Sequence, residues 1–228
     1  MPECGKTTFP IHPAGQTMKI AIIGSGNIGG SLGLIWAKAG HQVMFSGSRH
    51  PEKLDSLVAK ATGNATAGSP FQACQFGDVI LLAVPWPEVD QLLPALEESL
   101  EDKTVIDATN PLTPDFIDLA IGLSDSGGET VARRLPGSNV VKAFNSVGAN
   151  IFQSESRMFG DQVPSLFFCG NDPAAKQVVA TLISDAGFDP VDVGGIRSSR
   201  FLEPLEQLWV EILKSGIQQE FIFSLLRR

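Results

Sequence analysis

Short apolar runs alternate with amphipathic stretches along this chain from Lys19 onward. The runs are rich in Ile, Val and Leu and carry few polar residues, a pattern typical of strands that are buried on both faces of a parallel sheet. We predict strands at Lys19–Ile23, Gln42–Ser46, Asp78–Val84, Thr104–Ala108, Asn139–Phe144, Val163–Cys169 and Pro190–Val193.

The stretches between these runs place apolar residues at helical spacing. We predict helices at Ile28–Ala39, Pro51–Ala61, Pro87–Leu100, Glu129–Leu135, Pro173–Ala186 and from Ser199 to about Leu226. The alternation of strands and helices favours an α/β fold. The expected architecture is a Rossmann doubly wound, mostly parallel sheet of about eight strands with a short C-terminal helical segment.

A glycine-rich turn follows the first predicted strand and opens the first predicted helix. Its sequence is Gly24-Ser25-Gly26-Asn27-Ile28-Gly29. In this G-x-G-x-x-G pattern the first glycine permits a tight turn, the second lets a pyrophosphate approach the backbone, and the third brings the helix close to the sheet. The helix amino terminus then offers N–H groups to the pyrophosphate. We therefore predict a dinucleotide site that includes Gly24, Ser25, Gly26, Asn27 and Ile28.

The end of the second predicted strand carries no acidic residue. NAD-binding units usually place Asp or Glu there, about 20 residues after the glycines, to hold the ribose 2′-hydroxyl. This chain instead has Ser48 and Arg49, with Lys53 one helical turn further on. Arg and Ser can bond a 2′-phosphate, so we predict NADP(H) rather than NAD. A solvated basic cluster neutralised by Glu52 is the alternative.

Composition excludes several classes of partner. The formal net charge is −8, from 25 Asp and Glu against 17 Lys and Arg, so we expect no nucleic-acid and no membrane partner. No apolar run approaches the ~20 residues of a membrane-spanning helix. The three cysteines form no C-x-x-C pair and the three histidines have no metal-ligand spacing. We expect reduced, structural thiols, no metal site and a cytoplasmic protein.

The chain divides into three parts on composition. Residues 1–17 hold three prolines and few apolar residues, so we expect a disordered N-terminal extension. Residues 18–198 are expected to form the NADP-binding Rossmann domain. Residues 199–228 are expected to form a helical segment that packs on this domain or in a dimer interface.

No candidate catalytic acid or base stands out. The chain contains no tyrosine, which excludes the Tyr-x-x-x-Lys machinery of short-chain dehydrogenases. The segment after Ser199 is too short for the helical second domain of 6-phosphogluconate-type dehydrogenases. A reductase without a positioned proton donor suits a flavin or deazaflavin acceptor, because that cofactor carries the difficult chemistry and the protein aligns the two rings.

At this point the chain resembles the F420-dependent NADP oxidoreductase family. Beyond the glycine-rich turn, the resemblance lies in Gly47-Ser48-Arg49, Ala83-Val84-Pro85-Trp86, Asp107-Ala108-Thr109-Asn110-Pro111, Val141-Lys142-Ala143-Phe144-Asn145 and Arg200-Phe201-Leu202-Glu203-Pro204-Leu205. It runs from Lys19 to about Leu213. The chain is also similar to the NADPH-binding domain of transmembrane metalloreductases, which pass hydride from NADPH to a flavin.

The resemblance implies NADPH laid across the carboxyl ends of the strands. It implies Ser48, Arg49 and Lys53 at the 2′-phosphate, and Ala83, Val84, Pro85 and Trp86 beside the central ribose and nicotinamide. Asn110, Ala143 and Asn145 complete the expected cofactor-binding set, the last two close to the ring. The implied second substrate is F420 or a flavin, and a homodimer is expected from the C-terminal region.

Other interpretations stay open on the residues alone. Pro85 and Trp86 fit strand termination and core packing as well as cofactor contact, Asn110 before Pro111 fits a turn, and Lys142 fits an ion pair. An NADP(H)-binding redox sensor without turnover is the alternative function. Reduction of a small imine or carbonyl ranks below both, because the relevant reductases use a longer helical dimer domain.

Overall fold

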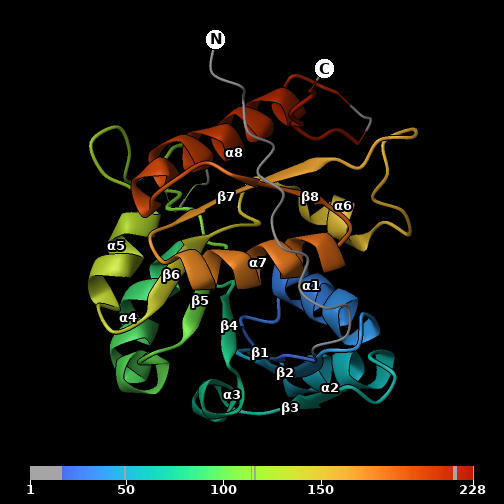
Figure 1. Cartoon of the computed structure of the whole chain (residues 1–228), viewed down its shortest axis with the longest axis vertical. Helices are drawn as coiled ribbons and strands as arrows, with labels where there is room; N and C mark the ends of the chain where they lie inside the picture. Colours follow the sequence, from blue (N-terminus) through green and yellow to red (C-terminus); the bar gives the residue numbers. More distant parts are fainter. Residues whose placement is uncertain (1–16, 49, 114, 116, 218–219, 228) are drawn as a thin grey trace.

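The computed structural model describes residues 17–48, 50–113, 115, 117–217 and 220–227, and all structural statements below concern these residues (Figure 1). The predicted extension at residues 1–17 therefore lies almost wholly outside the described residues, and Arg49 lies outside them as well.

One eight-stranded sheet forms the centre of the molecule, in the order β3-β2-β1-β4-β5-β6-β7-β8. Only the β6–β7 pair is antiparallel. The strands are β1 Lys19–Ile23, β2 Gln42–Ser46, β3 Ala65–Ala67, β4 Val79–Leu82, β5 Thr104–Asp107, β6 Asn139–Lys142, β7 Ser165–Gly170 and β8 Asp189–Asp192. The predicted doubly wound, mostly parallel sheet is confirmed.

Helices cover both faces of this sheet. They are α1 Asn27–Lys38, α2 Pro51–Lys60, α3 Pro70–Phe76, α4 Trp86–Leu96, α5 Gly127–Arg134, α6 Ala149–Gln153, α7 Pro173–Asp185 and α8 Ser199–Lys214, with 3-10 turns at Glu97–Leu100 and Ile196–Ser198. Helices α1 and α7 are in contact along one face, and Figure 1 shows them side by side. Helix α8 lies at the end of the molecule opposite α2 and α3 (Figure 1).

Alternate residues of each strand enter two separate cores, because successive side chains of a strand point to opposite faces. Ile20 and Ile22 pack with α1, α6 and α7, where Trp36 is the largest buried side chain. Ala21 and Ile23 pack with α3, α4 and α5 on the other face. Burial on both faces explains why the strands have the nearly continuous apolar sequences from which they were predicted.

The structure adds two elements to the predicted ones and shortens the last helix. The segment between α2 and β4 holds the short edge strand β3 and helix α3, which begins with a Ser69 capping box that the sequence analysis did not use. Helix α8 ends at Lys214 rather than near Leu226. Residues 220–227 instead form an extended strap, which bonds β7 where Ser224 Oγ accepts from the Ser165 N–H at 3.0 Å.

Candidate functional site

The candidate site lies at the carboxyl ends of the strands, beside the point where the strand order reverses between β1 and β4. Ligands of open α/β sheets bind in the crevice outside this position. The glycine-rich turn joins β1 to α1 there. Gly24 has a positive φ of 99°, and a Cβ at this residue would lie 2.5 Å from the Ala83 carbonyl oxygen. The turn therefore needs glycine, and it packs directly against the segment that follows β4.

The amino terminus of α1 suits an anionic group. Gly26 is the N-cap residue and no side chain caps this helix. A Cβ at Gly26 would meet no atom within 4 Å, whereas one at Gly29 would lie 2.1 Å from the Gly24 carbonyl oxygen. The backbone is thus open on the outer side of the turn and tightly packed on the inner side. This arrangement fits the pyrophosphate of a dinucleotide.

The flanking residues of the turn contribute differently from one another. Ser25 is buried, and its hydroxyl donates to the Ser46 carbonyl oxygen at 2.8 Å. Its side chain thus ties the turn to β2. Asn27 is exposed, while Ile28 is half-buried and packs against the core. Among the candidates of this motif, backbone groups and Asn27 are the ones that face outward.

The end of β2 leads into α2 through Ser48, whose Oγ accepts from the His50 N–H at 3.1 Å. Lys53 is exposed in the first turn of α2. Glu52 Oε1 lies 3.2 Å from His50 Nδ1, and both side chains are about three-quarters exposed. The Glu52 carboxylate thus lies beside His50. Ser48 and Lys53 lie on a surface that a phosphate can reach.

The segment after β4 places its four candidates in different environments. Val84 is buried at 7% exposure, and its Cγ1 would lie 2.8 Å from a Cβ at Gly24. Pro85 is exposed and is the N-cap of α4. Trp86 is half-buried and packs against the core. Ala83 is also half-buried. Packing thus explains Val84 and part of the burial of Ala83 and Trp86, and Pro85 is the exposed residue of the four.

The chain turns sharply after β6 at Phe144, which was predicted to end the strand. Phe144 has a φ of 65°, which is costly for a bulky side chain, on the order of 1–3 kcal/mol. Its ring is fully buried and makes an edge contact with Trp36 at 5.6 Å between centroids. The prediction of strand through Phe144 was wrong, because β6 ends at Lys142. Ala143 is also fully buried, and its side chain packs in the core.

Asn110 and Asn145 are brought together from the ends of β5 and β6. Asn110 Nδ2 donates to the Asn145 backbone oxygen at 2.9 Å, and Asn145 Nδ2 donates to Asn110 Oδ1 at 3.0 Å. Asn145 Nδ2 also donates to the Leu202 carbonyl oxygen of α8 at 3.1 Å. These two acceptors fix the orientation of the Asn145 amide. Its Oδ1 is buried and has no hydrogen-bond partner among the described residues.

A fully buried charge cluster holds α8 against the sheet. Lys142 Nζ lies 2.9 Å from both Asp107 Oδ2 and Glu203 Oε1, and it donates to the Thr109 carbonyl oxygen at 2.6 Å. The N–H groups of Gly127 and Gly128 donate to the same Glu203 carboxylate. Burial opposes the charge of Lys142, yet the attraction of the two carboxylates raises its pKa. Lys142 is therefore an ion-pair residue, one of the two interpretations left open above.

The same cluster fixes the start of α5. Gly127 and Gly128 are buried at the start of α5, where Glu203 holds them.

The described cysteines, Cys74 and Cys169, are free and buried. Burial raises the pKa of each thiol to about 11, so both are protonated at neutral pH. No three His, Cys, Asp or Glu side chains gather into a possible metal site in the described part of the chain. Within the same residues, no helix has the length and apolar character needed to cross a membrane.

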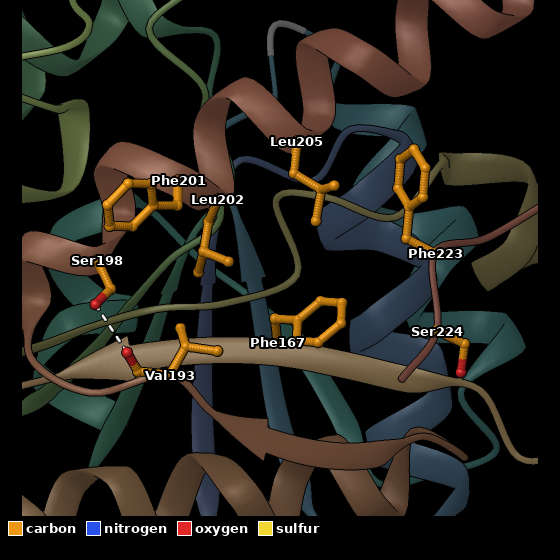
Figure 2. Close-up of a pocket in the computed structure, with 8 residues that line it drawn as sticks. All are labelled: Phe167, Val193, Ser198, Phe201, Leu202, Leu205, Phe223 and Ser224. Carbon is orange, nitrogen blue, oxygen red and sulfur yellow. Dashed lines mark hydrogen bonds between the residues drawn. The ribbon is translucent and has the colours of Figure 1, made fainter. Parts of the chain in front are cut away.

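An apolar cavity of about 450 Å³ lies on the other side of α8 from the charge cluster. Figure 2 shows Phe201, Leu202 and Leu205 of α8 facing Phe167 of β7 and Phe223 of the strap. Leu202 thus links two features, because its carbonyl bonds Asn145 while its side chain lines this cavity. The cavity does not include the glycine-rich turn.

Comparison with known proteins identifies similar reductases. The family described as "NADP oxidoreductase coenzyme F420-dependent" matches residues 19–111. The F420-dependent NADP reductase of Methanocaldococcus jannaschii is 29% identical over 208 residues, which cover 85% of this chain and 91% of that protein. A crystal structure from Arthrobacter sp. FB24, provisionally described as an F420 dependent NADP-reductase, has a TM-score of 0.82 and 27% identity and covers 92% of this chain and all of that one. The chain is similar to members of this family over most of its length.

The metalloreductase STEAP3 of Rattus norvegicus is a further relative, 30% identical over 190 residues. The match covers 83% of this chain but only 36% of the metalloreductase. The chain therefore spans about a third of that protein, and the similarity to it concerns one portion only.

Proposed function

We propose that this chain is an NADPH-dependent oxidoreductase that transfers hydride between NADP(H) and a deazaflavin (F420) or flavin acceptor. The observation that carries the proposal is the open, uncapped amino terminus of α1 at the strand-order reversal. The match of residues 19–111 to an NADP oxidoreductase family supports the choice of cofactor.

The proposed cofactor site extends along the carboxyl ends of the strands from β2 to β6. The N–H groups at the start of α1 would hold the pyrophosphate. Ser48 and Lys53, together with Arg49, would hold the 2′-phosphate, and the missing acidic residue removes a repulsive charge from this place. Ala83 to Trp86 would line the ribose and the nicotinamide.

Asn145 is proposed to orient the nicotinamide end. Its amide nitrogen is engaged by Asn110 and Leu202, which leaves Oδ1 as the only atom of the amide available to a ligand. An N–H donor of the nicotinamide carboxamide would satisfy this buried acceptor. When bound, NADPH would supply the hydride, and the chain would hold the ring still and exclude water.

The experiment is to follow oxidation of NADPH by the purified chain from its absorbance, with F420, FMN and FAD added separately. We expect turnover with at least one acceptor and much slower turnover when NADH replaces NADPH. Tight NADPH binding without turnover by any acceptor would instead support an NADP(H)-binding redox sensor.

We also propose that the chain forms a homodimer through α8. Phe201, Leu208 and Leu213 on this helix are 66%, 50% and 40% exposed, a large apolar surface for an isolated chain. Sedimentation equilibrium of wild type and Leu208→Asp tests the proposal. A wild-type monomer at micromolar concentration would contradict it.

A further inference from the structure

A closed network of buried polar groups lies at the carboxyl ends of β5 and β6. Lys142, the last residue of β6, donates from Nζ to Asp107 Oδ2 at 2.9 Å and to the Thr109 carbonyl oxygen at 2.6 Å. It also lies 2.9 Å from Glu203 Oε1 of α8, so the three hydrogens of its ammonium group all have acceptors. Asp107, the last residue of β5, accepts with Oδ1 from the N–H and the hydroxyl of Thr109. The network therefore fixes the ends of the two strands whose following loops carry the asparagine pair of the candidate site.

Glu203 is the residue by which α8 enters this network. Its Oε2 accepts from the Gly127 N–H and its Oε1 from the Gly128 N–H, both at 2.9 Å. A Cβ at Gly127 would lie 3.1 Å from Glu203 Oε1, and one at Gly128 would lie 2.3 Å from Ser199 Oγ. The start of α5 thus leaves room for α8 and its carboxylate. Charge-assisted bonds of Glu203 consequently set where α8 lies relative to the ends of β5 and β6.

The residue before Glu203 determines how the Asn145 amide is turned. The Leu202 carbonyl oxygen accepts from Asn145 Nδ2 at 3.1 Å, and Asn110 Oδ1 accepts from the same nitrogen at 3.0 Å. Both hydrogens of this nitrogen are therefore used, and Oδ1 points away from both acceptors. A shift of α8 would withdraw the Leu202 oxygen and leave one of the two acceptors that fix the amide.

We propose that Glu203 is a positioning residue for the nicotinamide carboxamide. By holding α8 on the strand ends, it keeps the Leu202 carbonyl against Asn145 and so directs Asn145 Oδ1 as an acceptor for a carboxamide N–H. The inference rests on the proposed function, because it takes the nicotinamide end to lie at Asn145. It requires no proton from the chain, in keeping with an acceptor that needs no positioned donor. Glu203 was not among the cofactor-binding residues expected from the sequence.

A cofactor analogue separates positioning from folding. The reduced 3-acetylpyridine analogue of NADPH keeps the pyrophosphate and the 2′-phosphate, and its acetyl group has no N–H for Asn145 Oδ1. Wild type should bind NADPH about 10-fold more tightly than this analogue, because the analogue leaves a buried acceptor without a partner. In Glu203→Gln the ratio should fall to about 2-fold, since NADPH loses a well-oriented acceptor and the analogue loses nothing. Quenching of intrinsic fluorescence measures both Kd values.

Two controls exclude effects of charge and of stability. Glu211→Gln removes a carboxylate of the same helix that is 55% exposed and pairs with Lys214, and its ratio should equal that of wild type. Val131→Ala truncates a fully buried side chain of α5. It should lower Tm and leave the ratio unchanged, because it leaves the bonds of Glu203 in place. In an Asn145→Ala background, Glu203→Gln should have no further effect on the ratio, since the two residues act through one contact.

The protein without cofactor supplies a second measurement. In nuclear magnetic resonance spectra, both Nδ2 hydrogens of Asn145 should exchange slowly in wild type, because both are donated to buried acceptors. The signals are assigned by their loss in Asn145→Ala. Exchange should become faster in Glu203→Gln and stay slow in Glu211→Gln and Val131→Ala. If Glu203→Gln does not fold, Glu203→Asp replaces it, since the shorter side chain keeps the charge and loses reach, with the same expected results.

The outcomes distinguish this inference from the proposed function. Equal wild-type affinities for NADPH and the analogue, or an unchanged ratio and slow exchange in Glu203→Gln, would overturn the positioning role even where NADPH is oxidised. The expected ratios without oxidation of NADPH by any acceptor would overturn the reductase function and support the positioning role. A wild-type chain that binds no NADPH would overturn both.

Discussion

The pyrophosphate end of the proposed site is made of backbone, whereas the nicotinamide end is made of buried polar side chains. Gly24, Gly26 and the start of α1 form the first end within a few residues of one another. The second end joins Asn110, Asn145 and Leu202, and the ion cluster beneath it joins Gly128 to Glu203, 75 residues apart. A local backbone site leaves a motif in the sequence, and an assembled side-chain site does not.

The largest expected effect comes from breaking the assembled end. Lys142→Met should lower the free energy of unfolding by about 3–5 kcal/mol, because it leaves Asp107 and Glu203 buried without a cation. Urea denaturation followed by circular dichroism measures the change. Lys176→Met is the control, since its pair with Asp192 is partly exposed and should be worth ~1 kcal/mol or less. Equal losses in both variants would mean that the buried cluster does not hold α8 in place.

The next effect is the pH dependence of folding stability that the protonation of Glu206 causes. Its pKa is raised on folding from 4.5 to about 8, so the folded chain binds more protons than the unfolded chain between these values. Stability from this group is present below pH 4.5 and is lost as pH rises through about 8. The free energy of unfolding of Glu206→Gln, relative to that of wild type, should therefore rise by on the order of 3 kcal/mol from pH 5 to pH 9. Urea titrations at each pH measure it. A constant difference across this range would contradict the raised pKa.

The same contrast explains what the sequence could and could not predict. The strands were predicted well because burial on both faces gives each a run of apolar residues, as in Val79–Leu82. Edge strand β3 has three residues, Ala65–Ala67, half-buried or exposed, and so leaves no such run. The prediction of helix beyond Lys214 followed the apolar residues of the strap. In the structure Phe221 stacks on Trp209, and Phe223 packs against Phe221.

The candidate residues divide in the same way. The glycine-rich turn could be located from spacing alone, because the tight turn and the close approach of helix and strand require glycine at fixed positions. The roles of Ser25 and Ala143 in packing depend on what folds against them, which spacing does not specify. The burial of Glu206 could not be predicted either, since only the tertiary structure removes water from its carboxyl group.

A smaller effect should follow from filling the space at the pyrophosphate end of the proposed site. Gly26→Ala places a methyl group where the protein itself has no atom within 4 Å and where φ is −75°. The chain should fold with an unchanged Tm, yet the affinity for NADPH should fall about 10-fold, because the methyl group occupies the space proposed for the pyrophosphate. Quenching of intrinsic fluorescence by NADPH measures the affinity. Gly122→Ala, also without a neighbour within 4 Å, is the matched control.

The smallest expected effect tests the preference for NADPH over NADH at the proposed 2′-phosphate position. Lys53→Met should weaken NADPH binding about 5-fold, since an exposed cation contributes ~1 kcal/mol to a charged contact. NADH lacks the 2′-phosphate, so its affinity should not change. Lys60→Met removes an equally exposed cation at the other end of α2 and should affect neither cofactor. A loss of NADH affinity equal to the loss of NADPH affinity would move Lys53 from the 2′-phosphate to a general role in attracting anions.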